Sequence, residues 1–283
     1  MQHMSVKLLT DSTAYITQSN LAALDISVVS LNVTIDQISK REVDFTQAEF
    51  YGLLKTTLTI PTSAQPSLDE MYQSFEVLVK DNHEVLAIFL SSKMSGTYSS
   101  AHLVRDMILE NYPNAVIHIL DSQSTAMEMG LMVTAAATAA AANQSLEEVS
   151  AVALDVRESS RFLFAPETLE YLKKGGRIGH ASALLGTLLQ IKPILTVEAA
   201  ETTVFKKVRT KKKVVTAFLE QLALDHQNRP LTEIVVHHIE SYDEAVALQD
   251  KIKAIYDCPI SIHDIGPVVG LHVGPGSIGV VYY

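Results

Sequence analysis

Residues 85–100 read VLAIFLSSKMSGTYSS, an apolar run followed by a turn rich in hydroxyl side chains. A short, continuous apolar run that ends in a polar turn is typical of a buried strand in a parallel sheet. Beyond the turn, Leu103 and Met107 keep helical spacing, so the hydroxyls lie where a strand leads into a helix. The first turn of a helix has unpaired N–H groups and a partial positive charge, which suit an anion. The stretch therefore indicates either a cradle for a carboxylate or phosphate, or plain N-capping by Ser95 or Thr97.

The first half of the chain alternates strand-like and helix-like segments. Candidate strands cover Val6–Thr10, Ser27–Thr34, Val85–Leu90 and Val116–Leu120, and candidate helices cover Thr46–Leu54, Leu68–Lys80, Thr97–Asn111 and Ala126–Ala142. This alternation favours an α/β domain with a parallel sheet, in which ligands collect at the carboxyl ends of the strands. Three of the strands lead into turns with hydroxyl side chains, at residues 11–13, 91–92 and 121–124. If these strands are neighbours, we expect their turns to converge on one edge of the sheet.

The second half of the chain has a different pattern of elements. Predicted helices cover Glu167–Lys174, Ala181–Ile191, Lys212–Asp225 and Asp243–Asp257, and predicted strands cover Pro193–Glu198, Thr203–Arg209, Ile234–His238, Ile260–Ile265 and Ile278–Tyr282. The order of these elements indicates a separate α+β layer domain. We therefore expect an α/β protein with an N-terminal parallel-sheet domain over residues 1–157 and a C-terminal α+β domain over residues 158–283.

Composition excludes several classes of protein. A hydrophobic content of 47% supports a substantial core. A net charge of −10 argues against nucleic-acid binding, because phosphate neutralisation needs Lys and Arg. The single cysteine, Cys258, rules out an intramolecular disulfide and fits the cytoplasm. The longest run of small apolar residues, Gly130 to Ala142, is too short to span a bilayer. No dinucleotide-binding, P-loop, zinc or α/β-hydrolase signature occurs, so we expect no cofactor and no metal.

Four loops contain candidate functional residues. His272 lies in the glycine- and proline-rich loop 266–277, which either positions the imidazole or is a surface turn with an incidental histidine. Thr62 and Ser63 precede Ser67, whose natural role is to cap the following helix. Gly175 and Gly176 end a helix, and they allow the guanidinium of Arg177 to approach a backbone-lined site or simply to point into solvent. The basic run Lys206–Lys213, which includes Arg209, is either a solvated face or a surface for docking or for phosphate approach.

In chain order, these segments resemble the DegV family of bacterial fatty-acid-binding proteins. The matching pieces are Asp11-Ser12, Thr62–Ser67, Ser91–Ala101, Asp121-Ser122, Leu169–Leu195, Val208–Lys213 and His272–Gly276. The resemblance implies two domains that hold one long-chain fatty acid between them, in a tunnel formed largely by the C-terminal domain. It also implies a cytoplasmic binding subunit of a bacterial fatty acid kinase, which presents the acyl carboxylate to an ATP-binding partner and performs no chemistry itself. Such a carrier has no integral membrane segment and allows transient contact with a membrane surface.

The resemblance also assigns site residues. It places the carboxylate contacts on Ser63, Ser95 and His272, and it makes Thr62, Arg177 and Arg209 candidate contacts of the head group or of the partner. The candidate tunnel wall consists of Leu184, Leu185, Leu188, Leu189, Ile191, Ile194 and Leu195, with ordinary core packing as the alternative for at least half of them. Two departures from the family pattern occur: Ala64 stands where the family usually has a serine, and the turn at Ala199-Ala200-Glu201 lacks the usual glycine.

Two other functions compete with the lipid carrier. An acyl hydrolase or acyltransferase would use Ser95 as nucleophile and His272 as base, although no acidic residue suggests itself to orient the base. A phosphate-binding module would use the helix N-terminus at residues 95–97. Labelling of Ser95 by a fluorophosphonate would favour the enzyme, and binding that depends on phosphate rather than acyl chain length would favour the module.

Overall fold

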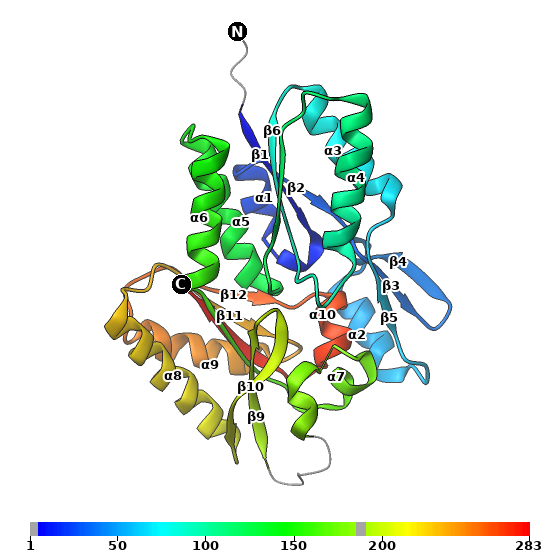
Figure 1. The fold of residues 1–283 in the computed structure, drawn as a ribbon. Helices are drawn as coiled ribbons and strands as arrows, with labels where there is room; N and C mark the ends of the chain where they lie inside the picture. Colours follow the sequence, from blue (N-terminus) through cyan, green and yellow to red (C-terminus); the bar gives the residue numbers. More distant parts are fainter. Residues whose placement is uncertain (1–4, 185–190) are drawn as a thin grey trace. The chain divides into compact units, whose positions relative to one another are not determined.

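The computed structural model describes residues 5–184 and 191–283, and Figure 1 shows the path of the chain. The chain divides into two compact units. The first unit contains residues up to 45 together with 63–159, and the second contains residues 46–62 together with 160–283. The second unit therefore includes a segment from the N-terminal half, residues 46–62, which the sequence pattern alone does not reveal.

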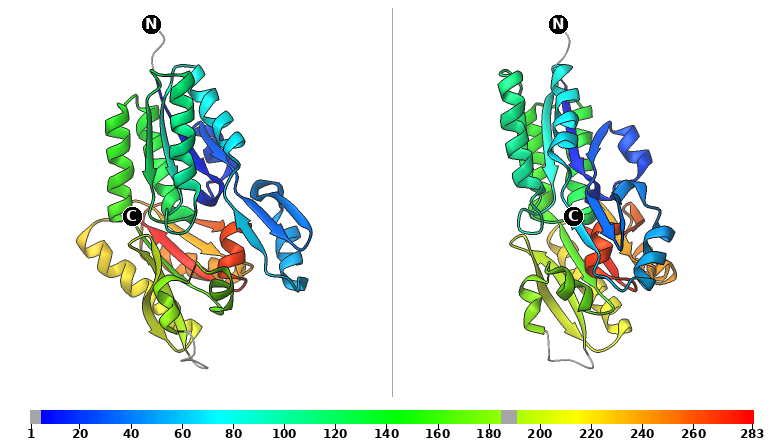
Figure 2. Two further views of the ribbon diagram at one scale, coloured as in Figure 1. Left: turned by 45° about the vertical axis from the view of Figure 1, so that its right-hand side comes forward. Right: turned by 90° about the vertical axis from the view of Figure 1, so that its right-hand side faces the viewer.

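The first unit is built on a parallel sheet of four strands in the order β2-β1-β6-β7. The strands are β1 (Val6–Asp11), β2 (Ile26–Val29), β6 (Glu84–Phe89) and β7 (Ile117–Asp121). Helices α3 (Leu68–Lys80) and α4 (Thr97–Asn111) cover one face of the sheet, and α5 (Ala126–Ala141) and α6 (Leu146–Ser159) contact the strands as a second layer (Figures 1 and 2). Helix α1 (Gln18–Ala23) follows β1 and the short η1 (Ser12–Ala14). The parallel-sheet prediction is confirmed.

The predicted strand Ser27–Thr34 is wrong, because the chain breaks there into β2 and β3 (Asn32–Ile35), which belong to different sheets. At the break, the N–H of Leu31 donates to Oγ of Ser12 at 3.1 Å, and its carbonyl accepts from the N–H of Glu42 at 2.7 Å. These contacts take the hydrogen-bonding groups of Leu31 out of the sheet. Strand β3 instead pairs with β4 (Ile38–Arg41), and β5 (Thr62–Ala64) completes a small sheet in the order β4-β3-β5.

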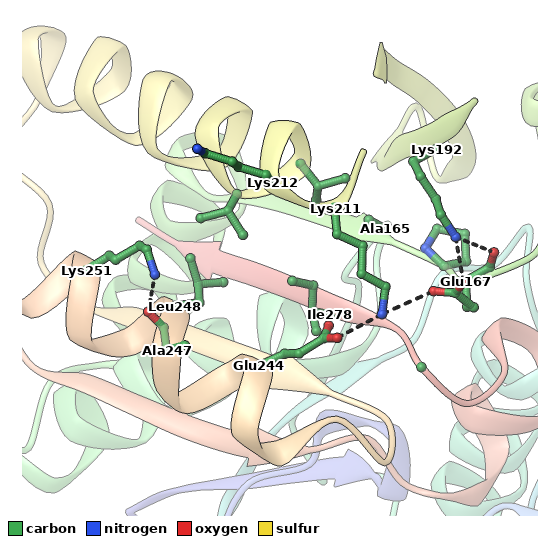
Figure 3. Close-up of a pocket in the computed structure, with 14 residues that line it drawn as sticks. Ala165, Glu167, Lys192, Lys211, Lys212, Glu244, Ala247, Leu248, Lys251 and Ile278 are labelled. Atoms are coloured by element: carbon green, nitrogen blue, oxygen red, sulfur yellow. Dashed lines mark hydrogen bonds and ion pairs between the residues drawn. The ribbon is translucent and has the colours of Figure 1, made fainter. Parts of the chain in front are cut away.

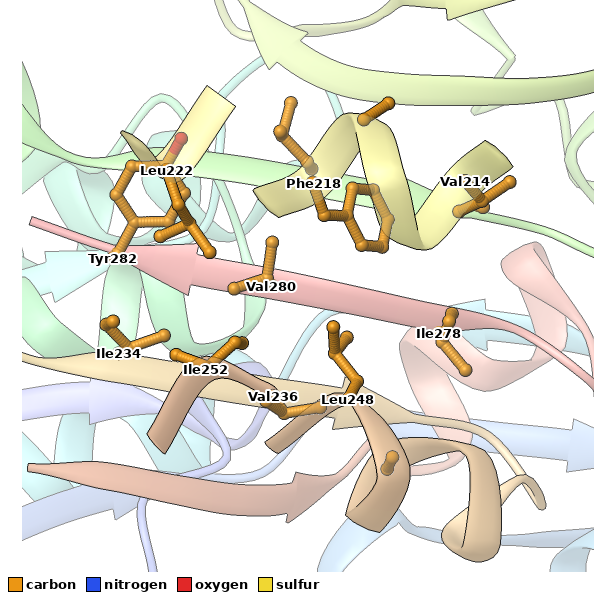
Figure 4. Packing of buried hydrophobic residues seen from close by; sticks show 14 of the residues in the cluster. Val214, Phe218, Leu222, Ile234, Val236, Leu248, Ile252, Ile278, Val280 and Tyr282 are labelled. Carbon is orange, nitrogen blue, oxygen red and sulfur yellow. The ribbon is translucent and has the colours of Figure 1, made fainter. Parts of the chain in front are cut away.

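The second unit has a mixed sheet of six strands in the order β10-β9-β8-β13-β11-β12. The strands are β8 (Arg161–Ala165), β9 (Lys192–Glu198), β10 (Glu201–Val208), β11 (Ile234–His238), β12 (Ile260–Asp264) and β13 (Ile278–Tyr282). Only the pair β11–β12 is parallel among the pairings of the described strands in this sheet. Helices α8 (Lys211–Asn228) and α9 (Tyr242–Lys253) bury side chains such as Phe218 and Leu248 against Val280 on one face (Figure 4). The predicted α+β layer architecture is confirmed.

The predicted helix Ala181–Ile191 is not an α-helix in its described part. Residues 179–184 form the 3₁₀-helix η3 (Gly179–Leu184), and residues 185–190 of the prediction lie outside the described residues. Gly179 has a φ of +50°, and a Cβ atom on it would lie 2.5 Å from the carbonyl oxygen of Thr202 on β10. This close packing against a strand holds the start of the segment away from α-helical geometry. Nowhere in residues 5–184 and 191–283 is a helix both long and apolar enough to cross a membrane.

Candidate functional site

The three turns with hydroxyl side chains meet at one edge of the first unit's sheet, as predicted. The N–H of Leu90, at the end of β6, donates to the Asp11 carboxylate at 2.8 Å. On the other side of β6, the N–H of Ser92 donates to Asp121 at 3.2 Å, and the N–H of Ser91 donates to the carbonyl of Ser124 at 2.7 Å. The ends of three neighbouring strands are thus tied together by hydrogen bonds.

Asp11 has a structural role at this edge. Its side chain is fully buried, and its Oδ1 accepts hydrogen bonds from the N–H and the hydroxyl of Thr13 at 2.9 and 2.6 Å. Burial raises the pKa of Asp11 to about 6, although the bonds from Thr13 and Leu90 oppose the rise. Both carboxylate oxygens accept hydrogen bonds, one from Thr13 in the turn and one from Leu90 at the end of β6. Asp11 therefore stabilises this edge of the sheet and is not a candidate ligand contact.

The predicted N-capping by Ser95 or Thr97 is wrong, because the N-cap residue of α4 is Gly96, which has no side chain to cap with. Ser95 lies directly before Gly96. Its Oγ accepts from the N–H of Thr97 at 3.3 Å and lies 2.9 Å from the Thr97 hydroxyl. Thr97 is completely buried, whereas Ser95 is only half-buried. Ser95 can therefore accept from the N–H of Thr97 and still offer its hydroxyl to a ligand, because a hydroxyl both donates and accepts.

The loop that carries Ser63 packs against the same helix start. The side-chain amide of Gln65 donates to the hydroxyl of Ser100 at 2.5 Å, and a Cβ atom on Gly96 would lie 2.1 Å from Oε1 of Gln65. Within β5, Ser63 is half-buried, whereas Thr62 is exposed. The contact through Gln65 anchors the segment that carries Ser63 beside the turn that carries Ser95. Sequence reasoning did not identify Gln65 in this role.

The Gly/Pro-rich segment around His272 is not a loop throughout, which corrects the prediction. Residues Pro267–Val273 form the short helix α10, with Pro267 in its first turn and Gly274 after its end. Proline suits the first helical turn, and glycine suits the position after the last one, where Gly274 has a φ of +86°. His272 lies in the last turn and is 8% exposed. The glycines and prolines thus fix His272 by forming a short helix.

Gly175 provides the surface on which the His272 ring rests. A Cβ atom on Gly175 would lie 2.1 Å from Nδ1 of His272, so only glycine permits this approach. Helix α7 (Glu170–Gly175) ends here, and Gly176 has a φ of +68° that turns the chain back. The guanidinium of Arg177 then donates to the carbonyl of Gly175 at 2.7 Å. Arg177 therefore approaches backbone atoms as predicted, and Gly175, whose carbonyl it binds, also contacts His272.

The surroundings of His272 keep its imidazole neutral. Burial lowers the pKa of His272 to about 4, and the nearby positive charge of Arg177 acts in the same direction. A neutral imidazole donates one N–H and accepts at its other nitrogen. The site therefore combines a neutral donor with an exposed cation, which suits a singly charged anion such as a carboxylate.

Tyr51 is a supporting residue that sequence reasoning missed. It lies on α2 (Gln47–Thr56), and its hydroxyl donates to the carbonyl of Ile265 at 2.8 Å, just before α10. A Cβ atom on Gly270 would lie 2.1 Å from this hydroxyl. Segment 46–62 therefore holds α10, and with it His272, in place. The glycine inside α10 is the sequence signal that indicates such a close approach.

The remaining candidates are the exposed Arg209 and the predicted tunnel wall. Arg209 is exposed at the end of β10, and among the described residues no hydrogen bond or ion pair joins it to Gly175, Arg177 or His272. Of the candidate tunnel wall, Ile194 belongs to the core beneath α8 and α9 and is not available to a ligand. Leu195 points to the opposite face of the sheet. Leu185, Leu188 and Leu189 lie outside the described residues.

The surroundings of His272 differ from those of the general base in a hydrolase. A catalytic triad needs a histidine with a pKa near the working pH and a carboxylate to stabilise its charged form. The charged group that shifts the pKa of His272 is the cation Arg177, and the pKa falls to about 4. An imidazole in this environment is a poor general base for Ser95.

Known proteins resemble this chain over almost its entire length. The family model described as "Uncharacterised protein, DegV family" matches residues 5–283. A DegV domain-containing protein of Clostridium acetobutylicum is 48% identical over 280 residues, which are 99% of this chain and 98% of the relative. The chain is also similar to two solved structures, and each comparison covers 99% of both chains. A fatty-acid-binding DegV family protein from Thermus thermophilus has a TM-score of 0.91 at 29% identity. DegV, a fatty acid binding protein from Bacillus subtilis, has a TM-score of 0.90 at 28% identity. The family resemblance expected from the sequence is confirmed.

Proposed function

The chain belongs to the DegV family, and from that premise we propose that it binds a long-chain fatty acid and presents the carboxylate to an ATP-dependent kinase partner. Relatives of the same fold are described as fatty-acid-binding proteins. The observation that carries the proposal is the buried, neutral His272, which rests on Gly175 beside Arg177. This arrangement favours a carboxylate, because the neutral imidazole of His272 can donate a hydrogen bond to it and carries no buried charge of its own.

We assign the carboxylate contacts to Ser63, Ser95 and His272. The two serines belong to the first unit and the histidine to the second, and each is half-buried or buried in a defined position. All three are neutral hydrogen-bond donors, so they orient the acid group while most of the affinity comes from the tail. Burial of a methylene contributes about 0.8 kcal/mol, so a chain of palmitate length could contribute over about 10 kcal/mol before ordering costs.

The kinase step requires little from this chain. The partner would transfer the terminal phosphoryl group of ATP to a carboxylate oxygen, which forms an acyl phosphate and releases ADP. This protein would supply the shielded tail and the oriented carboxylate, and it would work in the cytoplasm, where ATP is available. Thr62, Arg177 and Arg209 are exposed, and we assign them to the head group or to the partner.

We also propose a transient contact with a membrane surface, through which the fatty acid is exchanged. The connection between α2 and β5 carries Leu58, which is fully exposed, and Ile60, which is 58% exposed. Aliphatic side chains at a loop tip suit shallow insertion among acyl chains. This connection leads directly into Thr62 and Ser63, so the contact would bring the lipid close to the proposed site.

Ligand titration tests the proposed function. Delipidated protein should bind palmitic acid tightly, and cetyl alcohol, which has the same tail and no carboxylate, should bind more weakly. Adding a fatty acid kinase subunit with ATP should then give acyl phosphate only when this protein is present. Failure to bind palmitic acid would reject the carrier, whereas binding without phosphorylation would reject the kinase step alone.

A further inference from the structure

A cavity lies on the α8/α9 side of the six-stranded sheet, within the second unit. It has a volume of about 240 Å³ and is bounded by β8, β9, β13 and the facing sides of α8 and α9 (Figure 3). Residues proposed above to hold the fatty acid are not among its lining residues. The cavity therefore needs an explanation of its own.

The bottom of this cavity is apolar. Ala165, Val214, Leu248 and Ile278 line it, and each is less than 10% exposed. They belong to the core cluster between the sheet and the two helices, so the floor is rigidly packed. A ligand with an apolar body could rest on this floor and gain from burying its surface.

Two of the four lysines that line the cavity are held by carboxylates. Lys192 binds Glu167 at 2.6 Å, and Lys211 binds Glu244 at 2.8 Å and Glu167 at 3.4 Å. Burial opposes ionisation of Glu167, but Lys192 and Lys211 outweigh it and hold the pKa of Glu167 below its usual range. This chain of four charges forms one wall, seen on the right of Figure 3.

The other two lysines are not neutralised in this way. Within residues 5–184 and 191–283, neither Lys212 nor Lys251 has a carboxylate at ion-pair distance, and Lys251 donates only to the carbonyl of Ala247, at 3.1 Å. Both lie on the opposite side of the cavity in Figure 3. Four lysines against two glutamates leave two positive charges in excess at the cavity, in a chain whose net charge is −10.

We propose that this cavity binds a small, water-soluble organic phosphate monoester, with the phosphate between Lys212 and Lys251 and the organic part on the apolar floor. The proposal goes beyond fatty acid binding and does not depend on it. A phosphate monoester carries nearly two negative charges at neutral pH, which match the two excess positive charges. Lysine suits this role because its ammonium group binds phosphate as a compact point charge. A monocarboxylate would leave one of the two lysines uncompensated.

Phenyl phosphate is a suitable probe, because it joins a dianion to an apolar ring. We expect saturable one-to-one binding by calorimetry, with inorganic phosphate, benzoate and benzyl alcohol each binding at least tenfold more weakly. The double variant Lys212→Gln/Lys251→Gln should bind phenyl phosphate at least tenfold more weakly. A second variant, Ala247→Phe, should block the cavity without changing its charge, since Ala247 is exposed and lines it.

Lys213→Gln is the matched control, because Lys213 is an exposed neighbour on the same helix and does not line the cavity. It should leave the affinity unchanged, and all variants should unfold in denaturant at nearly the same concentration as the wild type. The proposal is overturned if phenyl phosphate does not bind. It is also overturned if Lys213→Gln weakens binding as much as the double variant, or if only vesicles that carry phosphatidic acid bind.

Discussion

Gly175 and His272 touch so closely that a Cβ atom on Gly175 would lie 2.1 Å from Nδ1 of the imidazole. The end of helix α7 is therefore the surface against which His272, the proposed carboxylate donor, packs. The turn at Gly176 then directs Arg177 back to the carbonyl of Gly175. Four residues thus build one half of the proposed site from two segments about a hundred positions apart in the sequence.

Gly175→Ala should displace the His272 ring and weaken palmitic acid binding. The added methyl group overlaps the imidazole, and overpacking of this kind typically costs about 1–3 kcal/mol of stability. Denaturant unfolding and a fatty acid titration measure both effects. Gly52→Ala is the control, since a Cβ atom there meets nothing within 4 Å and α2 should tolerate or prefer alanine. Equal affinity of Gly175→Ala and the wild type would show that the ring position does not matter.

His272→Phe and Ser95→Ala should each weaken the binding of palmitic acid but not of cetyl alcohol. Each variant removes a donor to a charged carboxylate, which is worth about 1.5–3 kcal/mol, or more than tenfold in affinity. Ser95→Ala should also lower stability modestly, because Ser95 accepts from the N–H of Thr97. Ser99→Ala, on an exposed position of α4, should change neither ligand's affinity. A parallel loss for acid and alcohol would indicate impaired binding of the acyl chain instead.

The stability contributed by His272 should depend on pH. Its pKa is about 4 in the folded protein and 6.5 ordinarily, so the unfolded chain binds more protons between these values. The contribution of neutral His272 to the free energy of unfolding is fully present above pH 6.5 and is lost as the pH falls toward 4. The loss has an upper limit of about 3 kcal/mol. We expect the difference in unfolding free energy between wild type and His272→Gln to shrink over this window in the ligand-free protein. A constant difference would show that the pKa of His272 is not lowered in the folded protein.

Leu58→Asp/Ile60→Asp should slow fatty acid transfer from vesicles without changing equilibrium affinity. Both side chains are exposed, so their replacement leaves the core intact, whereas acidic groups oppose insertion into the acyl region. Stopped-flow transfer of a fluorescent fatty acid from vesicles measures the rate. The control Val77→Asp replaces another exposed aliphatic residue, on α3. If it slows transfer equally, the surface at Leu58 and Ile60 has no special role.

Local sequence signals predicted local structure well. The bounds of α3 and α4 agree with the predictions, and Ser67 caps α3 as expected. Long-range contacts caused the errors. Ser12 and Glu42 break the predicted strand at Leu31, and Gly179 packs on Thr202 where a regular helix was expected. The glycine pair at 175–176 signalled a close approach, but no local pattern could identify His272 as its partner.

The most direct test of fatty acid binding is organic extraction of the purified protein followed by mass spectrometry. Any lipid-free fraction is then titrated with palmitic acid. We predict close to one fatty acid per chain in the wild type and a clear loss in the triple variant Ser63→Ala/Ser95→Ala/His272→Phe. A wild-type protein that contains no fatty acid and does not bind added palmitic acid would show that this chain is not a fatty acid carrier.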